Sequence, residues 1–241
     1  MRRNILFSLI LLLLFWQGLV WIFHLPEYVL PAPKDVLLTF IHSWKILVYN
    51  TSITLAETVL GLGFGALSGC IVAILLMTIR PLKLFLLPLM LISQALPVFA
   101  VAPLLVLWLG FGIASKIIVV MLMTFFPIAS ALFDGLNKTP AHYLTMATYM
   151  RGKQWPILRY IYFPHALPFL VSGLRISAVF APMGAIMSEW VGASYGLGYL
   201  MINANARLET SLVFASIIML VAMALALYFA IDAFFKWKIQ W

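Results

Sequence analysis

The sequence predicts an all-α polytopic membrane protein with six transmembrane helices. Hydrophobic residues make up 65% of the 241 residues, charged residues make up only 9%, and the apolar residues occur in long runs. A soluble domain carries about 25% charged residues, so this chain cannot cover its surface with charges. Only helices and closed barrels span bilayers. A barrel would alternate polar and apolar residues, and residues 5–20 do not.

Six apolar segments predict the crossings, because about 20 apolar residues are needed to cross a bilayer. We interpret the first as a retained span rather than a signal peptide, since no small-residue cleavage site follows it. Residues 84–109 are too long for one straight crossing and too short for two. A break is expected near Pro97, because proline removes a backbone donor and clashes with the preceding turn. The predicted spans are 5–23, 55–79, 84–96, 114–136, 167–191 and 212–235.

The basic residues orient the chain, because cytoplasmic loops carry an excess of Lys and Arg. With both termini cytoplasmic, ten of the 15 basic residues fall in cytoplasmic segments, four fall outside, and Arg175 lies within the fifth span. The net charge of +8 therefore requires no nucleic-acid partner. The ten are Arg2, Arg3, Arg80, Lys83, Lys138, Arg151, Lys153, Arg159, Lys236 and Lys238.

Small residues give the second span a packing face. Gly61, Gly65 and Gly69 form two overlapping G-x-x-x-G steps, which let membrane helices approach closely. Packing within the subunit and a seam between two copies both remain open. Ahead of this span, residues 24–50 are predicted to form an extended outer arm and then a short helix from Lys34.

Polar residues within the spans are candidates for a translocation path, because such residues face a cavity or a partner. Arg175 and Glu189 share a helix face but lie about 21 Å apart along it, so each needs a different partner. Hydration at the membrane interface is the alternative for the glutamates. A structural pair or a contact with helix-end carbonyls is the alternative for Arg175. The candidates are Glu57, Ser93, Gln94, Arg175 and Glu189.

The sequence predicts no catalytic, metal or cofactor site. It contains no P-loop pattern, and its histidines and single cysteine do not occur at metal-ligand spacing. Residues 192–196 match G-x-S-x-G, but His165 is the last histidine and precedes Ser194, whereas the hydrolase order places histidine afterwards. An intramembrane hydrolase is therefore kept only as the alternative of another class, beside a glycine-rich turn. A secondary transporter is disfavoured because no inverted repeat is found.

The loop between the fourth and fifth spans, residues 137–165, is basic and contains no acid. Thr139 before Pro140 resembles a helix N-cap, which predicts a helix over residues 141–150 that stops at Gly152. A second short helix is predicted to follow Pro156 and to end before Pro164. Two helices in a basic segment indicate either a docking element for a cytoplasmic protein or a site for lipid headgroups.

This loop resembles the cytoplasmic signature of bacterial ABC importer permeases, which reads E-A-A, then three residues and G, with an I-x-L-P ending. Thr145 replaces the acid, and the glycine is displaced by one position. The match also includes Ile161 and Phe163. The resemblance implies that an ATPase couples through Thr145, Met146, Ala147, Arg151, Gly152, Trp155 and Pro164.

The rest of the chain is similar to permeases of the nitrate/sulfonate/taurine group. Residues 203–207 are most like permeases that import the pyrimidine precursor of thiamine, hydroxymethylpyrimidine. The resemblance covers nearly the whole chain, and the matching segments are 28–36, 95–112, 173–175 and 189–207.

The resemblance implies a type I ABC importer permease in the bacterial plasma (inner) membrane. Its partners would be a second copy of itself, a cytoplasmic ATPase dimer that hydrolyses ATP, and a periplasmic or extracellular binding protein. The favoured substrate is the thiamine precursor, with sulfonate, taurine or nitrate as alternatives. The expected parts are an amino-terminal helix and arm (1–47), a permease core (48–235) and, within the core, a coupling loop (138–165).

Overall fold

The fold consists of helices throughout the described residues. The computed structural model describes residues 2–95, 97–149 and 153–238. The elements are α1 (Arg2–Phe23), α2 (Pro33–His42), α3 (Trp44–Thr78), α4 (Arg80–Ala95), α5 (Val98–Leu109), α6 (Ile113–Asn137), α7 (Ala141–Tyr149), α8 (Gln154–Ile157), the π-helical segment η1 (Leu158–Tyr162), α9 (Phe163–Gly192), α10 (Leu197–Ala206) and α11 (Thr210–Lys238).

The long apolar helices confirm the predicted all-α membrane fold. Four are long and apolar enough to cross a bilayer: α3, α6, α11 and the continuous helix Gln154–Gly192. The pair α4 and α5 meets the same criteria as one span bent by 100°, with Pro97 as the N-cap residue of α5. The expected break at this proline is confirmed, while Leu96 lies outside the described residues. A sixth crossing by α1, which has 22 residues, stays a prediction.

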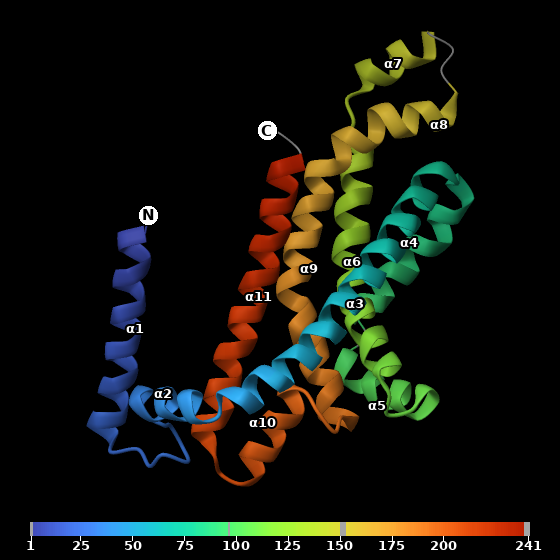
Figure 1. The fold of residues 1–241 in the computed structure, drawn as a ribbon. Coiled ribbons are helices and arrows are strands. Elements are labelled where there is room, and N and C mark those ends of the chain that lie inside the picture. The colour runs from blue at the N-terminus through green and yellow to red at the C-terminus, as the bar shows by residue number, and fades with distance from the viewer. Residues whose placement is uncertain (1, 96, 150–152, 239–241) are drawn as a thin grey trace.

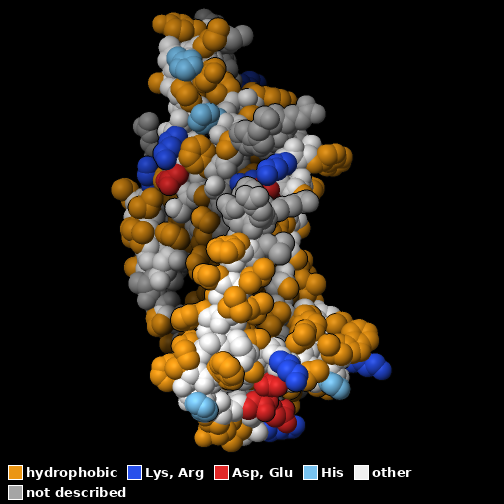
Figure 2. All heavy atoms as spheres, turned by 90° about the vertical axis from the view of Figure 1, so that its left-hand side faces the viewer, with side chains coloured by type: hydrophobic (Ala, Val, Ile, Leu, Met, Phe, Trp, Pro, Cys, Tyr) orange, Lys and Arg blue, Asp and Glu red, His pale blue; other side chains and the backbone are white. Residues whose placement is uncertain are grey.

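The bundle has two distinct ends (Figure 1). One carries α7 and α8, together with the beginning of α1 and the end of α11, and we call it the α7–α8 end. The other, which we call the α2–α10 end, carries α2, α5 and α10. On the face drawn in Figure 2, the coloured charged side chains lie toward both ends, and the stretch between them shows hydrophobic side chains among uncharged atoms. This distribution fits a molecule whose middle lies in hydrocarbon. The cytoplasmic assignment of the α7–α8 end stays a prediction.

Close packing of α3, α6 and α9 forms the core. The G-x-x-x-G face of α3 lies against α6: Gly61 faces Val120, and Gly65 faces Thr124. Gly69 faces the backbone of α6 as well. Packing within the subunit is therefore confirmed as the use of this face. Helix α6 also packs closely against α9 through further small residues, Gly135, Gly173 and Gly184.

Helix α3 begins earlier than the second predicted span, which starts at residue 55. It starts at Trp44 and has 35 residues, a length of about 52 Å. Its early polar side chains do not stop the helix, because they bond to backbone carbonyl groups of the same helix. Asn50 Nδ2 donates to Ile46 at 2.8 Å, and Thr51 Oγ1 donates to Leu47 at 2.6 Å. Their polar atoms are thus satisfied without breaking the helix.

The second loop helix does not end before Pro164, contrary to the prediction. Helix α8 continues through η1 into α9, and the helix bends where they join (Figure 1). A proline in a regular α-helix clashes with the carbonyl four residues earlier. The wider π turn that precedes Pro164 relieves this clash, so the chain bends instead of ending the helix.

The predicted N-cap of α7 is also wrong. The helix does begin at Ala141, as expected. However, the Thr139 hydroxyl is buried and has no hydrogen-bond partner among the described residues, so it does not cap the helix. The helix is described to Tyr149, whereas Met150 and the predicted stop at Gly152 lie outside the described residues.

The packing of α3 on α6 gives a matched pair of substitutions. Gly65→Leu places a side chain against Thr124, whereas a side chain at Gly63 meets nothing within 4 Å. Overpacking costs about 1–3 kcal/mol, so we expect Gly65→Leu to lower the thermal midpoint of the purified protein and Gly63→Leu to leave it nearly unchanged. Equal midpoints for the two variants would contradict this packing.

Candidate functional site

A buried carboxylate lies near the last turn of α9, at the α2–α10 end. The Glu189 side chain is only 1% exposed. Its Oε1 accepts a hydrogen bond of 2.6 Å from Thr54 Oγ1 of α3. Its Oε2 accepts one of 2.5 Å from the backbone N–H of Gly198 at the start of α10. A single side chain therefore joins three helices.

The first backbone amides of α10 are bound by side chains of α3. Gly196 N–H donates to Asn50 Oδ1 at 2.8 Å, and Leu197 N–H donates to Thr54 Oγ1 at 2.8 Å. Together with the carboxylate of Glu189, these side chains satisfy amides that a helix start otherwise leaves unpaired. Gly196 has a φ of +113°, and a Cβ there would overlap the carboxylate of Glu189. Only glycine fits this turn.

Glu57 and Lys116 extend this cluster beside a small cavity of about 290 Å³. Glu57 is 2% exposed and its carboxyl group interacts with that of Glu189, while its Oε2 has no hydrogen-bond partner among the described residues. Lys116 is 5% exposed and donates to the carbonyls of Phe111 (3.2 Å) and Gly112 (3.3 Å). Both glutamates are therefore buried in protein instead of lying exposed at the interface, and Glu57 also borders this cavity.

Arg175 has a different partner from Glu189, as their separation required. It forms an ion pair with Asp232 of α11, which also accepts a bond of 2.8 Å from Lys236. The pair joins α9 to α11, well away from Glu189. Of the other path candidates, Ser93 donates to the Met90 carbonyl of its own helix at 2.7 Å, and Gln94 is exposed on α4. Neither lies among the residues that bind Glu189.

The predicted coupling residues lie on a projecting helical pair at the α7–α8 end (Figure 1). Met146 and Trp155 are each 67% exposed, and Pro164 is exposed as well. Thr145 is exposed and its hydroxyl donates to the Ala141 carbonyl at 3.0 Å, whereas Ala147 is buried. Arg151 and Gly152 lie outside the described residues. Sequence reasoning missed three exposed aromatic residues that accompany them; we call the exposed set Tyr143, Met146, Tyr149, Trp155 and Tyr160 the α7–α8 surface.

The G-x-S-x-G match belongs to a packed turn. Ser194 lies between α9 and α10, with no strand before it. Gly192 packs against the Phe111 ring, and Gly196 accommodates Glu189. His165 lies at the opposite end of α9 from Ser194. The glycines therefore serve packing, and His165, the last histidine of the sequence, is too far from Ser194 to act as its base.

The sequence contained a signal for Asn50 and Thr54, the members of the buried cluster on α3 that were not among the predicted candidates. Asn50, Thr54 and Glu57 follow one another at helical spacing in a segment that is otherwise apolar. Polar residues at i, i+4 and i+7 form a stripe on one helix face, which predicts a polar partner. The burial of Lys116 had no comparable signal, since it follows the turn at residues 110–112.

Comparison with known proteins identifies the family. The family described as "Binding-protein-dependent transport system inner membrane component" matches residues 61–240. The chain belongs to this family of ABC importer permeases. It is accordingly a multi-pass protein of the inner membrane and a transport subunit.

Individual relatives agree with the family. A "Probable ABC transporter permease protein" of Haemophilus influenzae is 46% identical over 92% of this chain and 90% of its own length. The riboflavin transport system permease protein RibX of Chloroflexus aurantiacus is 34% identical over 97% of this chain and 88% of its own length. The formylaminopyrimidine transport permease protein ThiX of Halalkalibacterium halodurans is 32% identical over 89% of this chain and 86% of its own length.

Solved structures support the fold. A chain of the MetNI methionine ABC transporter in an inward-facing conformation superposes with a TM-score of 0.71 at 22% identity. The match covers 80% of this chain and 96% of the MetNI chain. The fold is therefore that of a type I ABC importer permease.

The buried cluster predicts unequal effects of two threonine substitutions on α3. Thr54→Val removes the donor to Glu189 and the acceptor for Leu197, whereas Thr51→Val removes only a bond within the helix. An unpaired buried polar group costs about 1–3 kcal/mol. We expect a lower thermal midpoint and faster proteolysis of the 193–197 turn for Thr54→Val. Matching midpoints and cleavage rates in the two variants would count against the cluster.

Proposed function

We propose that this chain is the membrane subunit of an ABC importer and that a separate ATPase dimer binds its α7–α8 surface. The observation that carries this proposal is a projecting helical pair with exposed aromatic residues, connected directly to two membrane helices. Tyr149 is 84% exposed, and Met146 and Trp155 are exposed as well. Aromatic residues and methionine are typical of the centres of protein interfaces. Binding of lipid headgroups alone would not require such an apolar surface.

The connections of this surface support a mechanical role. Helix α7 follows the end of α6 after a short turn, and α8 continues through η1 into α9. Because α6 and α9 pack closely through small residues, a push on the helical pair would tilt both together. That motion would reach Glu189 at the far end of α9, and alternating access would follow from rigid-body movement of packed helices. In this proposal the α7–α8 end is cytoplasmic.

A pair of permease subunits and a binding protein complete the proposed system. The path would run between two copies of this chain, with an extracytoplasmic binding protein delivering the substrate at the α2–α10 end. Glu57 stays a candidate for the path because its Oε2 is unpaired within the described residues and adjoins the small cavity. Arg175 pairs with Asp232, but its Nε is buried without a hydrogen-bond partner among the described residues, so Arg175 stays a candidate for the path as well. Glu189 is already bound by Thr54 and Gly198, and we propose that it holds helices together.

For the substrate we propose a pyrimidine precursor of thiamine, with sulfonate, taurine or nitrate as alternatives. Similarity to a formylaminopyrimidine permease at 32% identity supports this choice. Of the two more similar relatives, the Haemophilus influenzae protein has a name without a substrate, and the Chloroflexus aurantiacus protein is named for riboflavin, another heteroaromatic molecule. Sulfonate and taurine permeases match as well, over smaller shares of the chain. The test is uptake by proteoliposomes that contain the complete transporter. Labelled hydroxymethylpyrimidine should accumulate with ATP, and uptake of taurine instead would contradict the choice.

The ATPase contact predicts the effect of two surface substitutions. Met146→Asp and Trp155→Ala should each lower co-purification of the ATPase about tenfold, because residues of this kind dominate interface energies. Trp21→Ala is the matched control, since Trp21 is 81% exposed but lies on α1 near the opposite end. Membrane insertion should be unchanged in all three variants.

Two results would contradict the coupling proposal. One is wild-type retention of the ATPase by both surface variants. The other is uptake that survives ATP depletion and collapses with the ion gradient, which would indicate a secondary transporter.

A further inference from the structure

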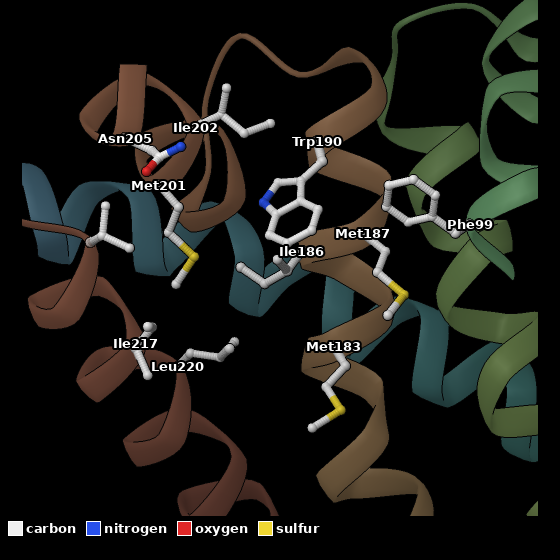
Figure 3. Close-up of a pocket in the computed structure, with 11 residues that line it drawn as sticks. Phe99, Met183, Ile186, Met187, Trp190, Met201, Ile202, Asn205, Ile217 and Leu220 are labelled. Atoms are coloured by element: carbon white, nitrogen blue, oxygen red, sulfur yellow. The ribbon is translucent and has the colours of Figure 1, made fainter. Parts of the chain in front are cut away.

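A second cavity opens between α5, α9, α10 and α11, in the half of the molecule toward the α2–α10 end (Figure 3). Its volume is about 740 Å³, within the range of sites for small organic molecules. Helix α9 contributes residues one turn apart along a single face, and α10 faces them across the space. The lining residues are Phe99, Met183, Ile186, Met187, Trp190, Met201, Ile202, Asn205, Val213, Ile217 and Leu220.

The lining suits a flat aromatic ring. The rings of Phe99 and Trp190 meet edge to face, with centroids 6.2 Å apart and planes at 78°. Aromatic rings prefer such offset or perpendicular partners, so another ring can add to this pair. Met183, Met187 and Met201 bring flexible side chains whose sulfur atoms make favourable contacts with ring edges.

Two polar groups in the lining are available to a ligand. The Asn205 amide and the Trp190 indole N–H make no side-chain hydrogen bond to any residue that the structure describes, and both residues are exposed to the cavity. An amide offers a donor and an acceptor side by side, and the indole offers a further donor. This combination matches the ring nitrogen and amino group of an aminopyrimidine.

The cavity lacks what an anion needs. None of its described lining residues carries a charge. Placing a sulfonate or nitrate in an apolar site without a cationic partner is strongly unfavourable. Arg175 and Lys116, cations within the membrane helices, are bound elsewhere, to Asp232 and to backbone carbonyls.

We propose that this cavity is a contact site for the transported molecule, and that it selects neutral, planar heteroaromatic rings over small anions. The inference rests on the proposed import function and adds the residues that would recognise the substrate. Phe99 and Trp190 contact the ring faces and edges, the methionines fill the remaining space, and Asn205 pairs with the hydrogen-bonding edge.

Cysteine protection tests occupancy of the cavity directly. The single cysteine, Cys70, is replaced by serine, and Met183→Cys is introduced into the complete transporter in proteoliposomes. Millimolar hydroxymethylpyrimidine should slow labelling by N-ethylmaleimide at least fivefold, whereas taurine should have no effect. Tyr28→Cys is the control, because Tyr28 is exposed on the outer arm and should label at the same rate with either compound.

Uptake separates this proposal from the proposed function. Trp190→Ala and Asn205→Leu should each lower the initial rate of pyrimidine uptake about tenfold while the ATPase stays bound. Phe229→Ala, at an exposed ring outside the cavity, should have no effect. If the wild type imports the pyrimidine but labelling and both variants are unaffected, the cavity proposal is wrong and the import function stands. If the wild type imports taurine and not the pyrimidine, both the cavity proposal and the substrate proposal are wrong.

Discussion

The carboxylate of Glu189 is the constraint on which the α2–α10 end of the molecule depends. A charge enclosed within a membrane protein is costly unless protein groups bind it. Thr54 from α3 and the amide of Gly198 from α10 supply those bonds. The same residues fix the start of α10, because Thr54 also accepts from Leu197 and Gly196 leaves room for the carboxylate. The position of α10, and with it one wall of the large cavity, follows from this one side chain.

Close packing in the core holds the helices in place along the rest of the bundle. Helices α3, α6 and α9 approach one another through small residues, and such contacts give stability in lipid, where the hydrophobic effect between helices is weak. The ion pair of Arg175 and Asp232 adds α11 to this core. Polar bonds therefore fix the helices at separate places, and close packing fixes them in between.

Hydropathy predicted most of the fold because helix spans in lipid depend on local composition. The break at Pro97 was equally local, since proline acts on its own preceding turn. The errors arose where a partner distant in sequence, or an unusual turn, determines the bounds of a helix or the burial of a side chain. The sequence of α3 does not show that Asn50 and Thr51 bond back to their own helix, so the early start of this helix at Trp44 was not predicted. The burial of Glu189 and Lys116 depends on α10 and on the carbonyls at residues 111–112, which composition cannot place.

The π-helical segment η1 also sets the direction in which α8 projects from α9. A π turn holds one more residue than an α turn, and one residue corresponds to about 100° of rotation about the helix axis. With an ordinary α turn between α8 and α9, Trp155 would face a different side of the molecule. The extra residue in η1 thus determines the side of the molecule toward which the Trp155 indole points.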